Sequence, residues 1–130
     1  MIADRNDGKW CPITLDELCV LIDEGVSRLD DDHIRFWNSI RIDPMKWMQH
    51  PWGELGGGFW VVALIGSTAI WYNDIEDGFN TSKFCHVGKL DEYWCDDLDL
   101  NHVVHQIRCS IVEAAPLPAK RGPPRPMVDE

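Results

Sequence analysis

The longest run of apolar residues lies in the middle of the chain, at Phe59–Ile65. A second run with strand-forming character, residues 68–72, follows after Gly66 and Ser67. Glycine at the first of two turn positions favours a type II′ hairpin between antiparallel strands. Because Phe59–Ile65 is apolar at consecutive positions, we expect a central strand that is covered on both faces of its sheet.

A helix is predicted near the N-terminus by a capping box and a periodic apolar face. Thr14 is the expected N-cap, and Glu17 stands three positions later, where its side chain can bond back to the N-cap amide. Apolar residues then recur at helical spacing as far as Leu29. We expect the helix to fray between Gly25 and Leu29, because glycine is a weak helix former.

A second helix is predicted close to the C-terminus. Asp97 or Asp99 is its expected N-cap, and its pattern ends near Glu113. Its apolar face is formed by Leu100, Val103, Val104, Ile107 and Ile111. A helix with one apolar stripe of this kind is expected to pack against another element of the fold.

The segment between the first helix and the hairpin is less regular. Residues 34–42 predict a short helical turn that leads into a strand at residues 40–42. Asp43 followed by Pro44 is a favourable pair for the N-cap and first position of a helix. We therefore expect one or two helical turns over residues 45–49, ending before the next proline.

Beyond the hairpin, residues 73–80 predict a turn in which Gly78 takes a positive φ. A third, more polar strand is expected over residues 81–87, and residues 90–95 fit either a short edge strand or a helical turn. The chain is thus predicted to be an α+β protein, with an antiparallel sheet of three to four strands and an N-terminal and a C-terminal helix packed on it.

The chain of 130 residues has the length of one domain. We expect a single globular domain over residues 1–114 and a proline-rich tail, disordered or polyproline-like, over residues 115–130. Within the tail, residues 120–126 fit a basic, proline-spaced ligand pattern for aromatic-lined grooves, although such matches arise by chance in any basic, proline-rich segment.

Net charge is the strongest signal in the composition, at −10. Residues 1–114 carry 20 acidic and nine basic side chains, whereas residues 115–130 carry two and three. A body this acidic predicts no binding to nucleic acid or anionic membranes, since phosphate contacts need lysine and arginine. It favours attraction to a basic protein partner, and solubility alone explains the same charge.

The sequence also predicts a soluble, cytoplasmic protein. Its first residues form no apolar signal core, and Phe59–Ile65 falls far short of the ~20 residues that span a bilayer. The five cysteines contain no Cys-x-x-Cys pair, and free thiols are normal in the cytosol. We expect them to behave as small hydrophobic side chains that are buried or partly buried.

The turn that follows the hairpin contains three carboxylates, Asp74, Glu76 and Asp77. A calcium-binding EF-hand loop needs oxygen ligands at its first, third and fifth positions and glycine at its sixth. No starting residue in this turn satisfies both requirements. Adjacent carboxylates on a hairpin tip are also poor acid–base catalysts unless a pocket raises one pKa. The sequence therefore predicts no catalytic residue, cofactor or metal site in this turn.

The same turn is flanked by aromatic residues, Trp71 and Tyr72 before it and Phe79 after it. Exposed aromatic side chains beside charged ones are typical of protein-binding surfaces. We therefore predict a partner-binding role for Trp71, Tyr72, Asp74, Glu76, Asp77 and Phe79, with a plain solvated turn as the simpler alternative.

His102, His105 and Cys109 stand on one face of the predicted C-terminal helix, which is how a helix can present zinc ligands. The apolar face of that helix lies opposite, so the three side chains are expected to point to solvent. A structural zinc site there would lack its fourth ligand and supporting shell. We therefore predict no metal at this position.

In residues 57–60, residues 71–80 and its acidic balance, the chain resembles small, acidic, tryptophan-rich bacterial proteins, including immunity proteins that neutralise toxin partners. The resemblance implies a binding role rather than catalysis and assigns no functional residue. We predict a non-enzymatic protein-binding domain of the immunity or inhibitor type. The alternatives are a small-ligand or carbohydrate-binding module that uses tryptophan faces, and a hydrolase that uses Glu76 or Asp77.

Overall fold

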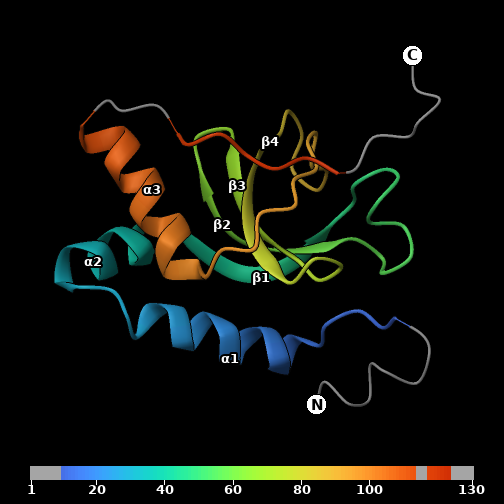
Figure 1. Ribbon diagram of the computed structural model, residues 1–130, viewed down its shortest axis with the longest axis horizontal. Helices are drawn as coiled ribbons and strands as arrows, with labels where there is room; N and C mark the ends of the chain where they lie inside the picture. Colours follow the sequence, from blue (N-terminus) through green and yellow to red (C-terminus); the bar gives the residue numbers. More distant parts are fainter. Residues whose placement is uncertain (1–9, 114–116, 124–130) are drawn as a thin grey trace.

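The computed structural model describes residues 10–113 and 117–123 of the chain. They form an α+β fold in which two helices precede a four-stranded antiparallel sheet and one helix follows it, as Figure 1 shows. The elements are α1 (Leu15–Val26), α2 (Asp31–Ile40), β1 (Arg41–Trp47), β2 (Phe59–Ile65), β3 (Thr68–Asn73), β4 (Gly78–Lys83) and α3 (Leu100–Val112). The predicted fold class is confirmed.

The four strands follow one another in the sheet in the order of the sequence, each antiparallel to the next. The hairpin of β2 and β3 closes with Ile65 opposite Thr68. Gly66 has a φ of +57° while Ser67 keeps a negative φ, which is the pattern of the predicted type II′ turn. The boundaries of β2 agree with the apolar run that predicted it.

Strand β2 is covered on both faces, as expected for the most apolar strand. A β-bulge lies between Val61 and Ala63, where the register with β3 shifts. The bulge turns both Val62 and Ala63 toward the helix-covered face, whereas Val61 points to the opposite face. All three side chains are fully buried. The bulge therefore explains why the apolar run of β2 does not alternate.

Two separate apolar clusters fill the two faces of the sheet. The first lies between the sheet and the helices and includes Leu18 of α1, Trp37 of α2 and Val104 of α3. The second lies on the other face of the sheet, under irregular segments, and includes Trp47, Phe59, Val61, Ala69, Trp71, Leu90, Tyr93 and Cys95. We call these the helix-covered face and the loop-covered face.

The helix ends follow the signals in the sequence. Thr14 and Glu17 form the predicted capping box at the start of α1. Asp30 caps α2 by accepting a hydrogen bond from the amide of His33. The helix α1 continues through Gly25 to Val26, because Gly25 packs closely on α3: a Cβ at this glycine would lie 2.7 Å from the Cβ of Leu100. This glycine sets the distance between the two helices.

The predicted helical turns over residues 45–49 are wrong, because this segment belongs to β1 and its continuation. Its backbone pairs with β2 from Arg41 to Trp47. Pro44 falls in the register shift between Arg41 and Met45, where a strand can lose one amide donor without losing a paired hydrogen bond. The long-range pairing with an apolar strand therefore outweighs the local helix signal of the Asp43–Pro44 pair.

The region after the hairpin also departs from expectation. Strand β4 begins at Gly78 and ends at Lys83, so it lies earlier than the predicted strand over residues 81–87. Residues 90–95 form neither a strand nor a helical turn. They belong to an irregular segment, residues 84–98, which covers the second face of the sheet. Side chains of Asn73, Asn80 and Ser82 in the sheet bind the backbone of this segment, which therefore needs no regular strand pairing.

Candidate functional site

The acidic turn between β3 and β4 is fixed by the residue that precedes it. The side-chain oxygen of Asn73 accepts hydrogen bonds from the amides of Ile75, at 3.0 Å, and Glu76, at 3.1 Å. The amide group of the same side chain donates to the carbonyl oxygen of Trp94 at 2.9 Å. Asn73 itself is fully buried. The turn is therefore held in one conformation by a side chain that is anchored in the fold.

The positive φ that we predicted for Gly78 is found one residue earlier, at Asp77, whose φ is +59°. Aspartate tolerates this left-handed conformation better than most residues. Gly78 is required for a different reason, because a Cβ there would collide with the backbone of Asp96 and Asp97. The prediction of a positive φ at Gly78 was wrong. The sequence signalled a glycine at this position, and the local pattern did not show that the approach of residues 96–97 is what requires it.

Asp74 has a structural position rather than an exposed one. It is 3% exposed, and its Oδ2 accepts the amide hydrogen of Ile13 at 2.8 Å. Its carbonyl oxygen accepts the indole N–H of Trp10 at 2.9 Å. The residue thus fastens the segment before α1 to the turn, and its carboxylate does not lie on the surface.

The three aromatic residues expected at the surface are buried, so the expectation of exposed aromatic anchors is wrong. Trp71 has no exposed surface and donates its indole N–H to Ser82 at 2.8 Å on the loop-covered face. Tyr72 and Phe79 pack edge to face, 4.9 Å between ring centroids, on the opposite face. Because neighbouring strand residues point to opposite faces, Trp71 is buried on the loop-covered face and Tyr72 and Phe79 on the helix-covered face.

The exposed part of the turn consists of Ile75, Glu76 and Asp77. Asp77 lies at the rim of a cleft of about 70 Å³ formed where the turn meets α1 and the start of α3. Two further carboxylates line this cleft, Glu24 from α1 and Asp99 from the N-cap of α3. Three elements that are distant in the sequence therefore bring carboxylates together.

One basic residue stands among these carboxylates. The guanidinium of Arg28 lies 3.5 Å from the carboxylate of Asp99, and both side chains are more than half exposed. Asp99 makes no capping hydrogen bond through its side chain, which leaves its carboxylate available to Arg28. The buried rings of Tyr72 and Phe79 also line the cleft. We call the exposed carboxylates of Glu24, Glu76, Asp77 and Asp99 the acidic rim.

The sequence did not indicate Glu24 or Asp99 as part of the site. Glu24 belongs to no motif and Asp99 was expected only as a helix N-cap; both line one cleft because Gly25 lets α1 approach α3 at Leu100. The only local signal was the glycine inside an otherwise helical pattern, which often marks a close packing contact.

Glu76 also lies near the irregular segment that covers the second face. Burial raises the pKa of Tyr93 to about 12, and the negative charge of Glu76 contributes in the same direction. Burial likewise raises the pKa of the Cys95 thiol, again with a contribution from Glu76. The negative potential of the turn therefore extends toward residues 93–95.

Polar side chains of the sheet hold this irregular segment in place. Asn80 accepts the amide hydrogen of Asp96 at 2.9 Å and donates to the carbonyl oxygen of the same residue at 3.0 Å. Ser82 donates to the carbonyl oxygen of Glu92 at 3.1 Å. Both side chains are buried. They explain how a segment without regular structure covers an apolar face.

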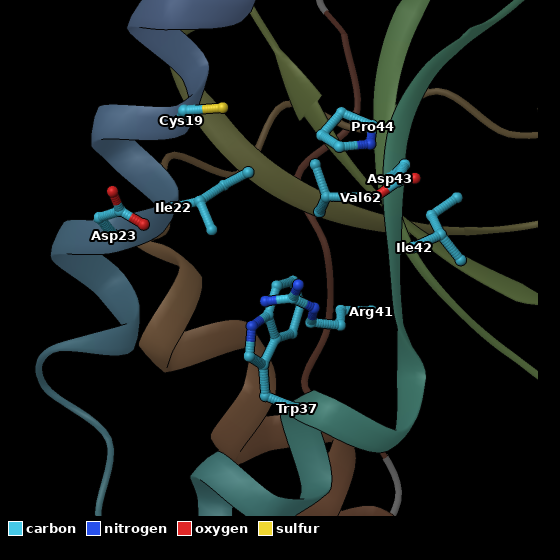
Figure 2. Close-up of a pocket in the computed structure, with 9 residues that line it drawn as sticks. All are labelled: Cys19, Ile22, Asp23, Trp37, Arg41, Ile42, Asp43, Pro44 and Val62. Carbon is cyan, nitrogen blue, oxygen red and sulfur yellow. The ribbon is translucent and has the colours of Figure 1, made fainter.

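A second hollow lies between α1, the end of α2 and β1, and is drawn in Figure 2. Its volume is about 160 Å³, and Trp37, Ile22 and Val62 provide apolar walls. Asp23 and Asp43 lie on opposite sides of it, on α1 and β1. Sites for small molecules usually measure ~300–1,000 Å³. This hollow is therefore too small for a sugar or a typical cofactor.

The two alternatives to protein binding, a carbohydrate or small-ligand module and a hydrolase, gain no support from the described residues. Trp52 is the one exposed tryptophan, at 40% exposure, and the others are buried or half-buried, so no open groove is lined by several indoles. The cleft beside Asp77 measures about 70 Å³, well below the ~300–1,000 Å³ of sites for small molecules. A hydrolase that uses Glu76 or Asp77 would need a larger pocket for its substrate.

His102, His105 and Cys109 are exposed on α3, as predicted. His105 stacks on His33 of α2, with 3.7 Å between ring centroids. Within residues 10–113 and 117–123, no group of three or more histidine, cysteine or acidic side chains is placed to hold a metal ion. Four of the five cysteines are exposed and only Cys95 is buried, so the expectation of buried or partly buried thiols is wrong for four.

In comparisons with known proteins, no family model, no curated protein and no solved structure matches the chain. Among the described helices, none has the length and apolar character needed to cross a membrane.

Proposed function

We propose that this protein is a non-enzymatic protein-binding domain, of the immunity or inhibitor type, that engages a basic partner through the acidic rim. One observation carries the proposal: Glu24, Asp77 and Asp99 come from three separate elements and line the same cleft, and the exposed Glu76 precedes Asp77 in the turn. A plain solvated turn would not require carboxylates from α1 and α3 at the same place.

The turn is also held by hydrogen bonds and close packing, which favours binding. Asn73 fixes the amides of Ile75 and Glu76, and Gly78 is locked against the backbone of Asp96. A surface that is already ordered loses little conformational entropy when it binds. The acidic rim therefore offers its charges in a fixed arrangement to a partner.

The mechanism is mainly electrostatic. A chain with net charge −10 attracts a basic protein over several ångströms and raises the rate of association. The buried Tyr72 and Phe79 support the cleft from below, and Ile75, 36% exposed, is the apolar residue within the exposed turn. Contacts by exposed rim charges change mainly the association rate and its dependence on salt.

The test begins with two baits, the wild-type chain and a Glu24→Gln/Glu76→Gln/Asp77→Asn variant, used on a lysate of the native host. Asparagine is chosen at position 77 because it tolerates the positive φ of Asp77. A basic protein captured by the wild type is then measured against both baits by surface plasmon resonance at several salt concentrations. We expect the association rate to fall about tenfold or more in the variant, and to fall with salt in the wild type.

An Asp16→Asn/Asp31→Asn/Asp32→Asn variant serves as the matched control, because it removes three exposed carboxylates from α1 and α2 and leaves the acidic rim intact. Its association rate is expected to stay within about twofold of the wild type. Equal rates for the wild type and the rim variant, or rates that do not respond to salt, would contradict the proposal.

A further inference from the structure

Part of the proline-rich tail lies against the folded body. Residues 117–123, drawn in red in Figure 1, lead away from α3 and cross in front of the sheet in that view. We call them the strap. The amide of Cys95 donates to the carbonyl oxygen of Arg121 at 2.7 Å, and the amide of Arg121 donates to the Asp96 carboxylate at 2.9 Å. The disordered alternative therefore does not describe this part of the tail, and residues 114–116 and 124–130 lie outside the described structure.

The strap also contributes one lysine to the contact. The Nζ atom of Lys120 donates to the hydroxyl of Thr81 on β4 at 2.6 Å. Thr81 is opposite Ile70 in the sheet, so its side chain lies on the helix-covered face. Gly122 approaches the ring of Trp94, since a Cβ there would lie 3.9 Å from that ring. The strap thus lies against β4 and residues 94–96, and we call the surface that these contacts define the groove.

This contact has the form of a bound peptide. Both backbone groups of Arg121 are used, the carbonyl oxygen by Cys95 and the amide by Asp96. One of these bonds joins two backbone groups and the other joins the backbone to a carboxylate; main-chain bonds give affinity for an extended chain, while a side-chain contact such as that of Lys120 adds selectivity. The groove therefore recognises an extended segment with a lysine before the residue that pairs through its backbone.

Charge favours a basic segment in this groove. Burial lowers the pKa of Lys120, and the negative charges of Asp96 and Glu92 oppose that shift because they favour the ammonium form. Burial raises the pKa of the Cys95 thiol, and the positive charge of Arg121 opposes part of that rise. The body of residues 1–114 is strongly acidic, and the strap supplies two adjacent positive charges to it.

The contact is also weak enough to exchange. Ala119, Arg121 and Gly122 are exposed, and the contact rests on three hydrogen bonds, made by Lys120, by the amide of Arg121 and by its carbonyl oxygen. Covalent attachment supplies the strap at an effective concentration on the order of millimolar. A separate basic segment can replace it once its own affinity for the groove overcomes that advantage.

We propose that the groove formed by Thr81, Trp94, Cys95 and Asp96 is a binding site for extended basic segments of a partner protein, and that the strap occupies it as a built-in competitor. The site is distinct from the acidic rim, although the two are adjacent through the contact of Gly78 with Asp96. It does not require the proposed function of the acidic rim to be correct.

The test uses the full chain and a fluorescent peptide with the sequence of residues 117–123, blocked at both ends. In one variant, Lys120→Gln and Arg121→Pro weaken the strap by removing the Thr81 contact and the amide donor to Asp96. Fluorescence polarisation is expected to show the peptide binding at least tenfold more tightly to this variant than to the wild type. Adding Asp96→Ala to the variant is expected to weaken binding at least tenfold again.

Two controls separate the groove from other effects. A peptide with glutamine in place of its lysine is expected to bind several-fold more weakly to the strap variant. Glu24→Gln/Asp77→Asn, which alters the acidic rim, is expected to change peptide affinity by no more than about threefold. Failure at the rim and failure at the groove are therefore distinguishable.

Hydrogen exchange provides the second measurement in the same proteins. The amide of Cys95 is expected to be protected in the wild type, to exchange faster in the strap variant and to regain protection when the peptide is added. Equal peptide affinity for the wild type and the strap variant, or no loss of affinity with Asp96→Ala, would overturn the proposal. So would an unprotected Cys95 amide in the wild type.

Discussion

The two faces of the sheet are covered in different ways. Helices cover one face through periodic apolar side chains such as Leu18 and Val104. The other face is covered by irregular segments, which hydrogen bonds from Asn73, Asn80 and Ser82 hold in place. The comparison shows that buried polar side chains on a sheet can position a loop as definitely as an apolar stripe positions a helix. Both proposed binding surfaces lie next to the irregular cover.

The largest expected effect tests whether the loop-covered face is a true core. Trp71→Ala removes a fully buried indole and its hydrogen bond to Ser82. We expect the free energy of unfolding to fall by about 3–5 kcal/mol, in the range for large-to-small core substitutions. Leu18→Ala on the helix-covered face is the matched comparison, with an expected loss of about 2–5 kcal/mol. Urea unfolding measures both, and a loss below 1 kcal/mol for Trp71→Ala would show that this face is loosely packed.

The next prediction breaks the polar attachment of the loop. Asn80→Ala leaves the amide and the carbonyl oxygen of Asp96 without their buried partner. Because each unsatisfied group costs about 1–3 kcal/mol, we expect a loss of about 2–4 kcal/mol in the free energy of unfolding. Asn38→Ala, at an exposed position of α2, is expected to stay within about 0.5 kcal/mol of the wild type. Equal values for the two variants would mean that Asn80 does not position residues 92–98.

Much of the helix-covered face could be predicted because its signals are local. The capping box at Thr14 and Glu17 and the apolar stripe of α3 each lie within a few residues of the element they specify. The apolar run of β2 and the turn at Gly66 predicted the central hairpin for the same reason. The helix over residues 45–49 failed because its competitor, pairing with β2, depends on residues that are distant in the sequence.

The candidate site could be predicted only in part. The position of the acidic turn was correct, and Glu76 and Asp77 are exposed there. The burial of Trp71 and Asp74 could not be predicted, because it depends on segments that arrive from residues 84–98 and 10–13. The exposure of a side chain depends on which distant segments pack over it. The local sequence pattern shows only which residues are apolar enough to be buried.

Alkaline pH is expected to weaken the loop-covered face. Burial raises the pKa of Tyr93 to about 12, above the ordinary value of 10. A group with a raised pKa contributes stability that is fully present below the unfolded value and is lost as pH rises through the folded value. We therefore expect unfolding free energy to decline between about pH 10 and 12, and to decline less in Tyr93→Phe. Thermal unfolding at successive pH values measures this, and identical slopes for the two proteins would contradict the role of Tyr93.

Acid pH is expected to lower the stability of the helix-covered side through Asp30, by less than alkaline pH lowers that of the loop-covered face. The amide of His33, and then its side chain, hold the pKa of Asp30 below its ordinary value. A lowered pKa contributes stability above the unfolded value, and this contribution is lost as pH falls through the folded value. The free energies of unfolding of the wild type and Asp30→Asn are therefore expected to differ at pH 6 and to converge below about pH 3. Unfolding followed by circular dichroism measures both. A difference that persists at low pH would exclude this ionisation as its cause.

The most direct test of the account concerns where a basic partner binds. The ¹⁵N-labelled full chain is titrated with the basic protein captured by the wild-type bait, and amide shifts are followed by NMR. We predict that the largest changes lie at Glu24, Glu76, Asp77 and Asp99, and that they shrink as salt is added. Changes concentrated on the exposed face of α2, or spread evenly over the chain, would contradict the assignment of the acidic rim as the binding surface.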